Sequence, residues 1–231
     1  MFFNKILPAT VLAFSFGISH AENQTANDVE QEPQQQTAEQ KQFSAEKDAQ
    51  IKMSLKTRLE KFDGFSANFS QAVIDADGNT LQNATGKLVV KRPNLIYWET
   101  MQPDETLVIS DGDTLWFYNP FVEQVSAFNV SNAVVNTPIL LLSDTSTETW
   151  QDYLVTQQSS DEYSIKSLNS DAQVKSLNLF FAGDNLAMFT IVDATGQLSH
   201  FNLSNMVTTP VPADSIFKFT LPVDVDFDDQ R

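Results

Sequence analysis

Apolar residues recur with a helical period between residues 51 and 62. Their spacing of four, four and three residues places them on one face of a helix. Lysine, arginine and glutamate fill the positions between them, as on the solvated side of an amphipathic helix. Asp63-Gly64 provides a turn that ends the helix. The apolar positions are Ile51, Leu55, Leu59 and Phe62.

Beyond this helix the apolar positions alternate with polar ones, which is the period of a β-strand. Phe65, Ala67 and Phe69 share one face. Turn-forming pairs that contain Gly, Pro, Asn or Asp then recur at strand-length spacing. We expect the last strand at Phe217–Leu221. About ten or eleven short antiparallel strands fit this spacing, so we predict a mainly β protein with a highly curved sheet or barrel.

One segment breaks the strand rhythm. Thr137 suits the N-cap of a helix and Pro138 suits its first position. Four bulky apolar residues follow at Ile139–Leu142. A helix this short, with apolar residues all round, must be buried on several sides or cover something apolar.

The N-terminus has the parts of a cleavable secretory signal at residues 1–21. Lys5 supplies a positive charge, Ile6–Ile18 form an apolar run, and Ser19 and Ala21 are small residues at the spacing of a signal peptidase site. The apolar run is too short for a comfortable membrane span, although a single membrane anchor is the alternative. We therefore expect cleavage after Ala21 and export to the periplasm.

The segment after the signal has a different composition. Residues 22–44 are acidic and Gln-rich and contain almost no large apolar residue, so we expect a disordered tether. Residues 45–231 are long enough to form one domain with a sizeable core.

The chain is acidic and lacks cysteine. It has 14 Lys and Arg against 30 Asp and Glu, for a formal net charge of −16. This charge repels phosphate backbones and disfavours adsorption to anionic membranes, so nucleic acid is not expected as a partner. With no Cys, disulfides, thiolate catalysis, Cys-ligated metals and an acylated N-terminal cysteine are excluded.

Residues for catalysis or metal binding are sparse. His200 is the one histidine outside the signal, and we interpret it as a structural or surface residue. Asp111 and Asp113 fall in a turn, where Asp is common for local hydrogen bonding. Residues 224, 226 and 228 form an acidic tail. We assign no catalytic residue, no metal site and no cofactor; a hydrolase with an acidic pair remains an alternative.

Bulky apolar side chains are abundant. The chain has 18 Phe, 3 Trp and 4 Tyr, and the strands Leu95–Trp98 and Leu115–Tyr118 carry large residues on both faces. One face can line the concave side of a curved sheet while the other packs against an outer element. These residues alone fit a filled core as well as a cavity. An exported chain without catalytic residues, but with an apolar cover, favours a cavity.

Several stretches match one known family. The stretch that contains Trp-Phe-Tyr-Asn-Pro is the most specific of them. They resemble the outer-membrane lipoprotein carrier family, LolA, from about Leu55 to the C-terminus, with the tether outside the resemblance. The stretches are Val90–Leu95, Gln102–Glu105, Leu115–Gln124, Asn136–Pro138 and Asp228–Arg231.

The resemblance implies a fold and a function. The fold is an incomplete, highly curved antiparallel β-barrel with a helical lid over an apolar cavity, which takes the acyl chains of lipoproteins. The family receives cargo from the inner-membrane transporter LolCDE and passes it to the outer-membrane receptor LolB. We therefore expect a monomeric periplasmic chaperone that is not an enzyme. A periplasmic binding protein for another lipid or glycolipid is the alternative.

The resemblance also implies roles for residues. Arg92 matches the family arginine that hydrogen-bonds to lid backbone in the closed, empty form, with partners at Leu59 and at Leu142 and Ser143. Ile96 and Trp98 share strand parity and hence a face. The residues expected in the acyl-chain cavity are Leu55, Phe69, Ile96, Trp98, Ile139, Leu140 and Leu141.

Overall fold

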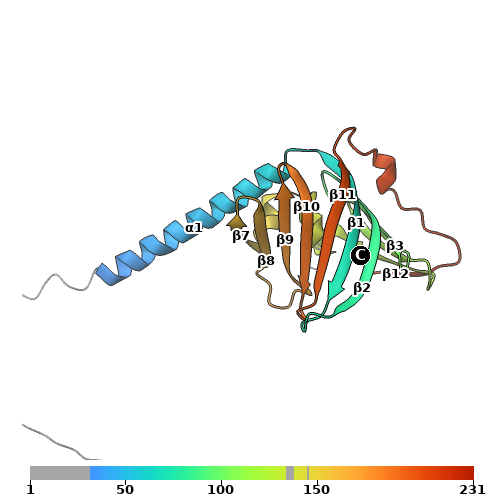
Figure 1. The fold of residues 1–231 in the computed structure, drawn as a ribbon, viewed down its shortest axis with the longest axis horizontal. Coiled ribbons are helices and arrows are strands. Elements are labelled where there is room, and N and C mark those ends of the chain that lie inside the picture. The colour runs from blue at the N-terminus through green and yellow to red at the C-terminus, as the bar shows by residue number, and fades with distance from the viewer. Residues whose placement is uncertain (1–31, 134–137, 145) are drawn as a thin grey trace, which may run out of the picture. The chain divides into compact units, whose positions relative to one another are not determined.

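A strongly curved β-sheet is the main element of the protein. The computed structural model describes residues 32–133, 138–144 and 146–231, and within them twelve strands join in the order β12-β6-β5-β4-β3-β2-β1-β11-β10-β9-β8-β7. All neighbours are antiparallel except β12 and β6, which run parallel. The edge strands β7 and β12 do not pair, so the sheet is the incomplete barrel that was expected (Figure 1).

The strands are β1 (Gly64–Ile74), β2 (Thr80–Lys91), β3 (Leu95–Gln102), β4 (Thr106–Asp111), β5 (Thr114–Asn119), β6 (Gln124–Asn129), β7 (Tyr153–Ser159), β8 (Glu162–Ser167), β9 (Val174–Ala182), β10 (Asn185–Asp193), β11 (Leu198–Val207) and β12 (Asp226–Asp229).

Helix α1 (Glu32–Leu59) precedes the sheet and ends before Asp63-Gly64, as the sequence predicts. It begins earlier than Ile51, because Glu, Gln, Ala and Lys favour a helix even where no apolar face requires one. Residues 32–44, expected to be part of a disordered tether, are therefore helical. The remainder of that tether and the signal at 1–21 lie outside the described residues. Gln42–Arg231 form one compact unit, which contains the second part of α1 and the whole sheet.

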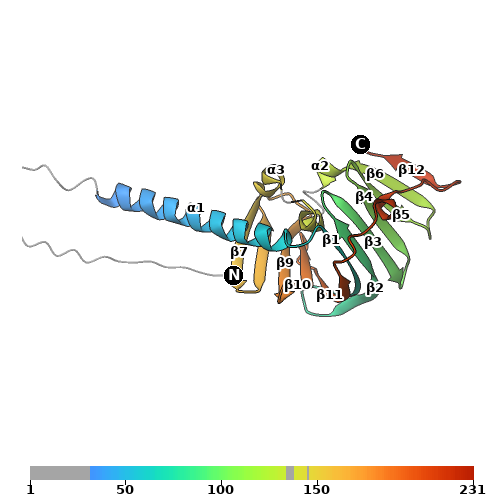
Figure 2. The same cartoon turned by 90° about the horizontal axis from the view of Figure 1, so that it is seen from above.

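Three short helices lie in the described part of the connection between β6 and β7. They are α2 (Val130–Ala133), the 3-10 helix η2 (Pro138–Leu142) and α3 (Thr147–Trp150). Figure 2 shows α2 and α3 on the side where the two ends of the curved sheet face each other. The predicted short helix at Pro138 is confirmed, while its expected N-cap, Thr137, lies outside the described residues.

The concave face of the sheet carries the hydrophobic core. Phe65 and Phe69 on β1 are buried, as their alternation with polar residues predicts. Phe69 also belongs to a cluster of four rings with Trp98, Phe189 and Phe201, in which contacting centroids lie 4.5 to 5.9 Å apart. These rings come from β1, β3, β10 and β11, so the cluster joins strands from both halves of the sheet.

The outer face of β5 is covered by the C-terminal segment. Trp116 stacks on Phe219 and Phe227, with ring centroids 5.1 and 6.2 Å away. The strand expected at Phe217–Leu221 is wrong, because Phe217 ends the 3-10 helix η3 (Asp214–Phe217) and is buried, while Phe219 packs on Trp116. A strand forms later instead, at β12, where Phe227 also contacts Trp116.

Candidate functional site

A cavity of about 270 Å³ lies between the concave face of the sheet and η2. Thr106 is the single polar residue among the ten that line it. The cavity is therefore suited to an apolar ligand, because burying apolar surface is favourable and few polar groups are present to hold a polar ligand. The lining residues are Ile96, Trp98, Thr106, Val108, Leu115, Phe117, Ile139, Leu140, Val174 and Ile191.

The register of the central strands explains which side chains face this cavity. Trp98 pairs with Val108, and Val108 pairs with Phe117, so β3, β4 and β5 contribute one row of side chains to the concave face. Ile96 and Leu115 belong to the neighbouring row, which continues through β4. Leu115 and Phe117 line the cavity while the intervening Trp116 packs outside, so both faces of β5 are used as expected.

Four of the seven residues expected in the cavity line it: Ile96, Trp98, Ile139 and Leu140. The other three are buried in the core around it. Phe69 contacts the rings of Trp98 and Phe201, whereas Leu55 and Leu141 are fully enclosed.

Six lining residues were missed by the sequence analysis. Val108, Leu115 and Phe117 could have been found from strand parity. Val108 and Phe117 continue the row of Trp98 across β4 and β5, and Leu115 lies in the row of Ile96. Val174 and Ile191 come from β9 and β10, in the other half of the sheet, and give no local signal. They reach the cavity only because the sheet curves back on itself. Thr106 is polar, so a search for apolar side chains would not select it.

The cover of the cavity is held together by its own polar groups. The carbonyl oxygen of Leu140 accepts hydrogen bonds from the amide and hydroxyl of Ser143, at 3.0 and 2.9 Å. The indole nitrogen of Trp150 donates to the carbonyl of Asp144 at 2.6 Å, which joins α3 to the end of η2. Ile139–Leu142 are all buried, as expected for an apolar helix of this length.

Arg92 joins the end of β2 to the end of α1. Its guanidinium Nη2 donates to the carbonyl oxygen of Leu59, and its backbone amide donates to the carbonyl of Asp63 at 2.9 Å. Leu59 is the last residue of α1, where carbonyls lack partners within the helix and attract cations. Burial lowers the pKa of Arg92, whereas the carboxylates of Glu60 and Asp63 favour its charged form. The side chain remains a cation, since arginine is not deprotonated in proteins.

The hydrogen bonds that we expected from Arg92 to the end of η2 do not form in this structure. Among the hydrogen bonds of the described ranges, Arg92 makes none to Leu142 or Ser143, and its Nε is buried without a partner. The polar groups of Ser143 are already directed to Leu140, within the helix itself. In this form, therefore, Arg92 is bound to α1 and not to η2.

Comparison with known proteins identifies the family. The family model for the outer membrane lipoprotein carrier protein LolA matches residues 60–220. The outer-membrane lipoprotein carrier protein of Aeromonas salmonicida is 41% identical over 179 residues, which are 77% of this chain and 88% of the relative. The chain belongs to the LolA family. The carrier protein of Yersinia enterocolitica is 42% identical over 190 residues, 82% of this chain and 93% of the relative.

The region that matches the LolA model contains the whole cavity lining and Arg92, whereas α1 precedes it and β12 follows it. A solved structure of the LolA superfamily protein NE2245 from Nitrosomonas europaea is also similar, at 14% identity over 74% of this chain and 97% of that chain, with a TM-score of 0.44.

Two of the polar residues considered for catalysis, His200 and Asp111, have structural partners in this LolA family member. Nδ1 of His200 lies 2.7 Å from the hydroxyl oxygen of Thr190 on the adjacent strand. Asp111 accepts from the Thr114 amide at 2.8 Å and the Trp116 indole at 2.9 Å. Desolvation raises the pKa of Asp111, but these hydrogen bonds outweigh it and the net pKa is below the usual value. In the described ranges no cluster of three or more His, Asp or Glu could hold a metal ion.

Across residues 32–133, 138–144 and 146–231, none of the helices combines the length and the hydropathy that a membrane crossing requires.

Proposed function

We propose that this protein is a periplasmic chaperone that shields the acyl chains of lipoproteins and carries them to the outer membrane. The observation that supports this best is the apolar cavity beneath η2, in a chain of the LolA family. A chaperone of this kind needs a site that binds acyl chains and a gate that closes it. The proposal gives no residue a catalytic role.

Hydrophobic transfer explains why such a carrier is needed. Removing one methylene group from water is worth about 0.8 kcal/mol, so an acyl chain of about 14 methylenes gains roughly 11 kcal/mol on burial. A free lipoprotein would therefore not leave its membrane at a useful rate. A carrier that kept all of this energy could not release its cargo, so part of it must be used to open a closed state.

The size of the cavity supports an opening step. Its volume of about 270 Å³ is below the roughly 300–1,000 Å³ of typical small-ligand pockets. Several acyl chains do not fit this form. We propose that cargo binding displaces η2 from the concave face and separates α1 from β2, and that the hydrogen bond between Arg92 and Leu59 favours the return to the closed form.

The partners follow from this role. We propose that a LolCDE-type transporter in the inner membrane loads the protein and that a LolB-type receptor in the outer membrane unloads it. We also propose that residues 1–21 act as a cleaved signal that brings the chain to the periplasm, that 22–44 link it to the carrier domain at 45–231, and that the protein works as a monomer.

Release of a radiolabelled lipoprotein from spheroplasts tests the proposal. Purified protein added to spheroplasts should bring labelled lipoprotein into the supernatant as a one-to-one complex, and an equal amount of albumin should not. Mass spectrometry of the complex should find triacylated protein. A phospholipid or glycolipid as the sole ligand would refute the lipoprotein assignment.

A further inference from the structure

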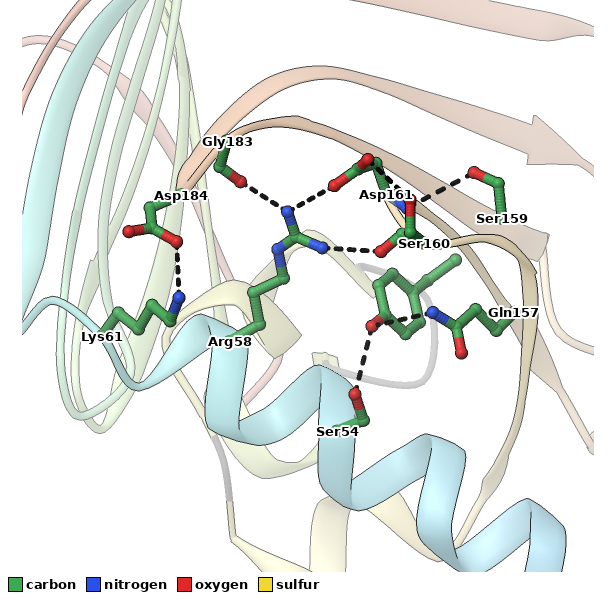
Figure 3. Close-up of polar contacts among 10 residues, drawn as sticks. Ser54, Arg58, Lys61, Gln157, Ser159, Ser160, Asp161, Gly183 and Asp184 are labelled. Carbon is green, nitrogen blue, oxygen red and sulfur yellow. Dashed lines mark hydrogen bonds and ion pairs between the residues drawn. The ribbon is translucent and has the colours of Figure 1, made fainter.

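A second arginine binds the end of α1 to the half of the sheet that does not contain Arg92. Arg58 donates through Nη1 to the carbonyl of Ser160 at 2.8 Å and through Nη2 to the carboxylate of Asp161 at 2.7 Å and the carbonyl of Gly183 at 2.5 Å (Figure 3). Its guanidinium carbon also lies 4.4 Å from the ring centre of Phe181. Only 15% of the Arg58 side chain is exposed, so the contact is poorly screened by water.

These contacts join two separate turns. Ser160 and Asp161 lie between β7 and β8, and Gly183 lies between β9 and β10. One planar guanidinium therefore bridges two hairpins and the helix, which a fork of fixed donors can do and a single ammonium group cannot.

Further contacts attach α1 to the same half of the sheet. The hydroxyl of Ser54, which Figure 3 labels, lies 3.2 Å from the hydroxyl of Tyr163 on β8. Lys52 donates to the carbonyl of Trp150 in α3 at 2.8 Å. Lys61, just beyond the helix, pairs with Asp184 at 2.5 Å. The end of α1 is thus anchored to β7–β10 and to α3 by several polar contacts.

Among the described residues, the hydrogen bonds between α1 and the other half of the sheet are fewer. At the end of β2, Arg92 binds the Leu59 carbonyl with its side chain and the Asp63 carbonyl with its backbone. Arg58 and Leu59 are adjacent in sequence, so the position of the Leu59 carbonyl depends on how Arg58 holds the last turn of α1. The two arginines thus link one short segment to different halves of the sheet.

We propose that Arg58 is a positioning residue of the gate: it fixes the last turn of α1 on the β7–β10 half of the sheet and thereby presents the Leu59 carbonyl to Arg92. This inference rests on the proposed function, in which breaking the contact of Arg92 opens the cavity. When the Arg92 bond breaks, α1 stays with β7–β10, and the gap opens between α1 and β2.

Entry of Nile red, a neutral dye that fluoresces in apolar surroundings, tests this without any lipoprotein. The full-length mature protein is compared with Arg58→Gln, Arg92→Leu and the double variant in stopped-flow experiments. Each single variant should speed entry about tenfold or more, as expected for loss of charge-assisted hydrogen bonds. The double variant should be no faster than the faster single one, because both act on the same contact.

Two further variants separate gating from folding. Lys61→Gln removes a neighbouring ion pair whose side chains are 48% and 72% exposed, and it should change the rate by less than about twofold. Arg58→Lys keeps a charge beside Asp161 but loses the fork, and it should speed entry several-fold, between wild type and Arg58→Gln. If Arg58→Gln does not fold, the rate of Nile red entry into Arg58→Lys tests the role of Arg58 in its place.

If the increase in the rate of Nile red entry in the double variant equals the product of the two single increases, Arg58 acts independently of Arg92. That result would overturn the proposal. So would an Arg58→Lys protein that matches wild type. A wild-type protein that admits Nile red through this gate but takes up no lipoprotein would refute the proposed function alone. Normal lipoprotein uptake without coupling between the arginines would refute only the inference about Arg58.

Discussion

The ring of Phe69 occupies the space that a side chain on Gly86 would need. A Cβ atom on Gly86 would overlap Cζ of Phe69 and the carbonyl oxygen of Glu99. Phe69 and Gly86 are paired between β1 and β2, so the ring passes over β2 and meets Trp98 on β3, at 5.3 Å between centroids. A missing side chain on one strand thus allows aromatic packing between the two strands beside it.

Replacing Gly86 with alanine should therefore destabilise the protein. The added methyl group meets backbone as well as a buried ring, so we expect a loss of about 1–3 kcal/mol or more in the free energy of unfolding, measured by urea denaturation. Thr85→Ala on the same strand is the control, since residue 85 is exposed and its change should stay within about 0.5 kcal/mol. Equal stability of the two variants would contradict the close approach of Phe69.

A charge at Phe117 should reduce cargo binding without unfolding the protein. Phe117 lines the cavity but is 43% exposed, so the fold can tolerate a carboxylate there, while an acyl chain cannot pair with it. Phe180 is the matched control, because it is also a strand residue, 39% exposed, and does not line the cavity. In a lipoprotein pull-down, Phe117→Glu should retain less than about a tenth of the wild-type cargo, and Phe180→Glu should retain most of it. The reverse result would place the binding site elsewhere.

Arg92→Leu should accept cargo and release it poorly. Loss of one hydrogen bond to a charged group costs about 1.5–3 kcal/mol, which would shift the balance from the closed to the open form about ten- to a hundredfold. Transfer of labelled lipoprotein to receptor-bearing outer-membrane vesicles measures the effect. Lys91→Met is the control, since Lys91 is adjacent but pairs with Asp214 and not with α1. Unchanged transfer by Arg92→Leu would refute the gate.

The carboxylate of Asp229 should titrate at unusually low pH. Hydrogen bonds from the Arg231 side chain and backbone lower the pKa of Asp229 to about 2, from 3.8. Because the folded-state pKa is below the unfolded one, the stabilisation is present above pH 3.8 and is lost as the pH falls through about 2. In an NMR titration, Arg231→Met should raise the Asp229 pKa toward 3.8 but leave it below that value, because the backbone amide of residue 231 still donates to Asp229. A wild-type midpoint already near that value would show that the ion pair does not form in solution.

The parts of the fold that depend on local patterns were predictable. Period-two alternation placed Phe65 and Phe69 on the buried face of β1, and an all-apolar run after Pro138 predicted the buried η2. Alternation also favoured a strand at Phe217–Leu221, where the apolar residues instead cover Trp116. An outer layer on a sheet needs apolar residues as much as a strand does, so the pattern alone could not separate the two.

The composition of the cavity was only partly predictable. Ile96 and Trp98 followed from strand parity and the family resemblance, but Val174 and Ile191 reach the cavity through the curvature of the whole sheet. Leu55 has the same chemistry as the lining residues and is packed in the core. Whether a large apolar side chain packs in the core or lines the cavity depends on residues that are distant in the sequence. A local sequence pattern does not show which residues these are.

The C-terminal strand β12 also affects whether two copies of this protein can associate through the edge of the sheet. An exposed sheet edge offers unpaired backbone groups on which a strand of another molecule can assemble. Here one edge ends in a strand of four residues, three of them the aspartates 226, 228 and 229. Two copies that approached through this edge would bring these carboxylates together, on chains that each carry a net charge of −16. One edge of the sheet thus ends in groups of like charge, which opposes aggregation of two copies through that edge.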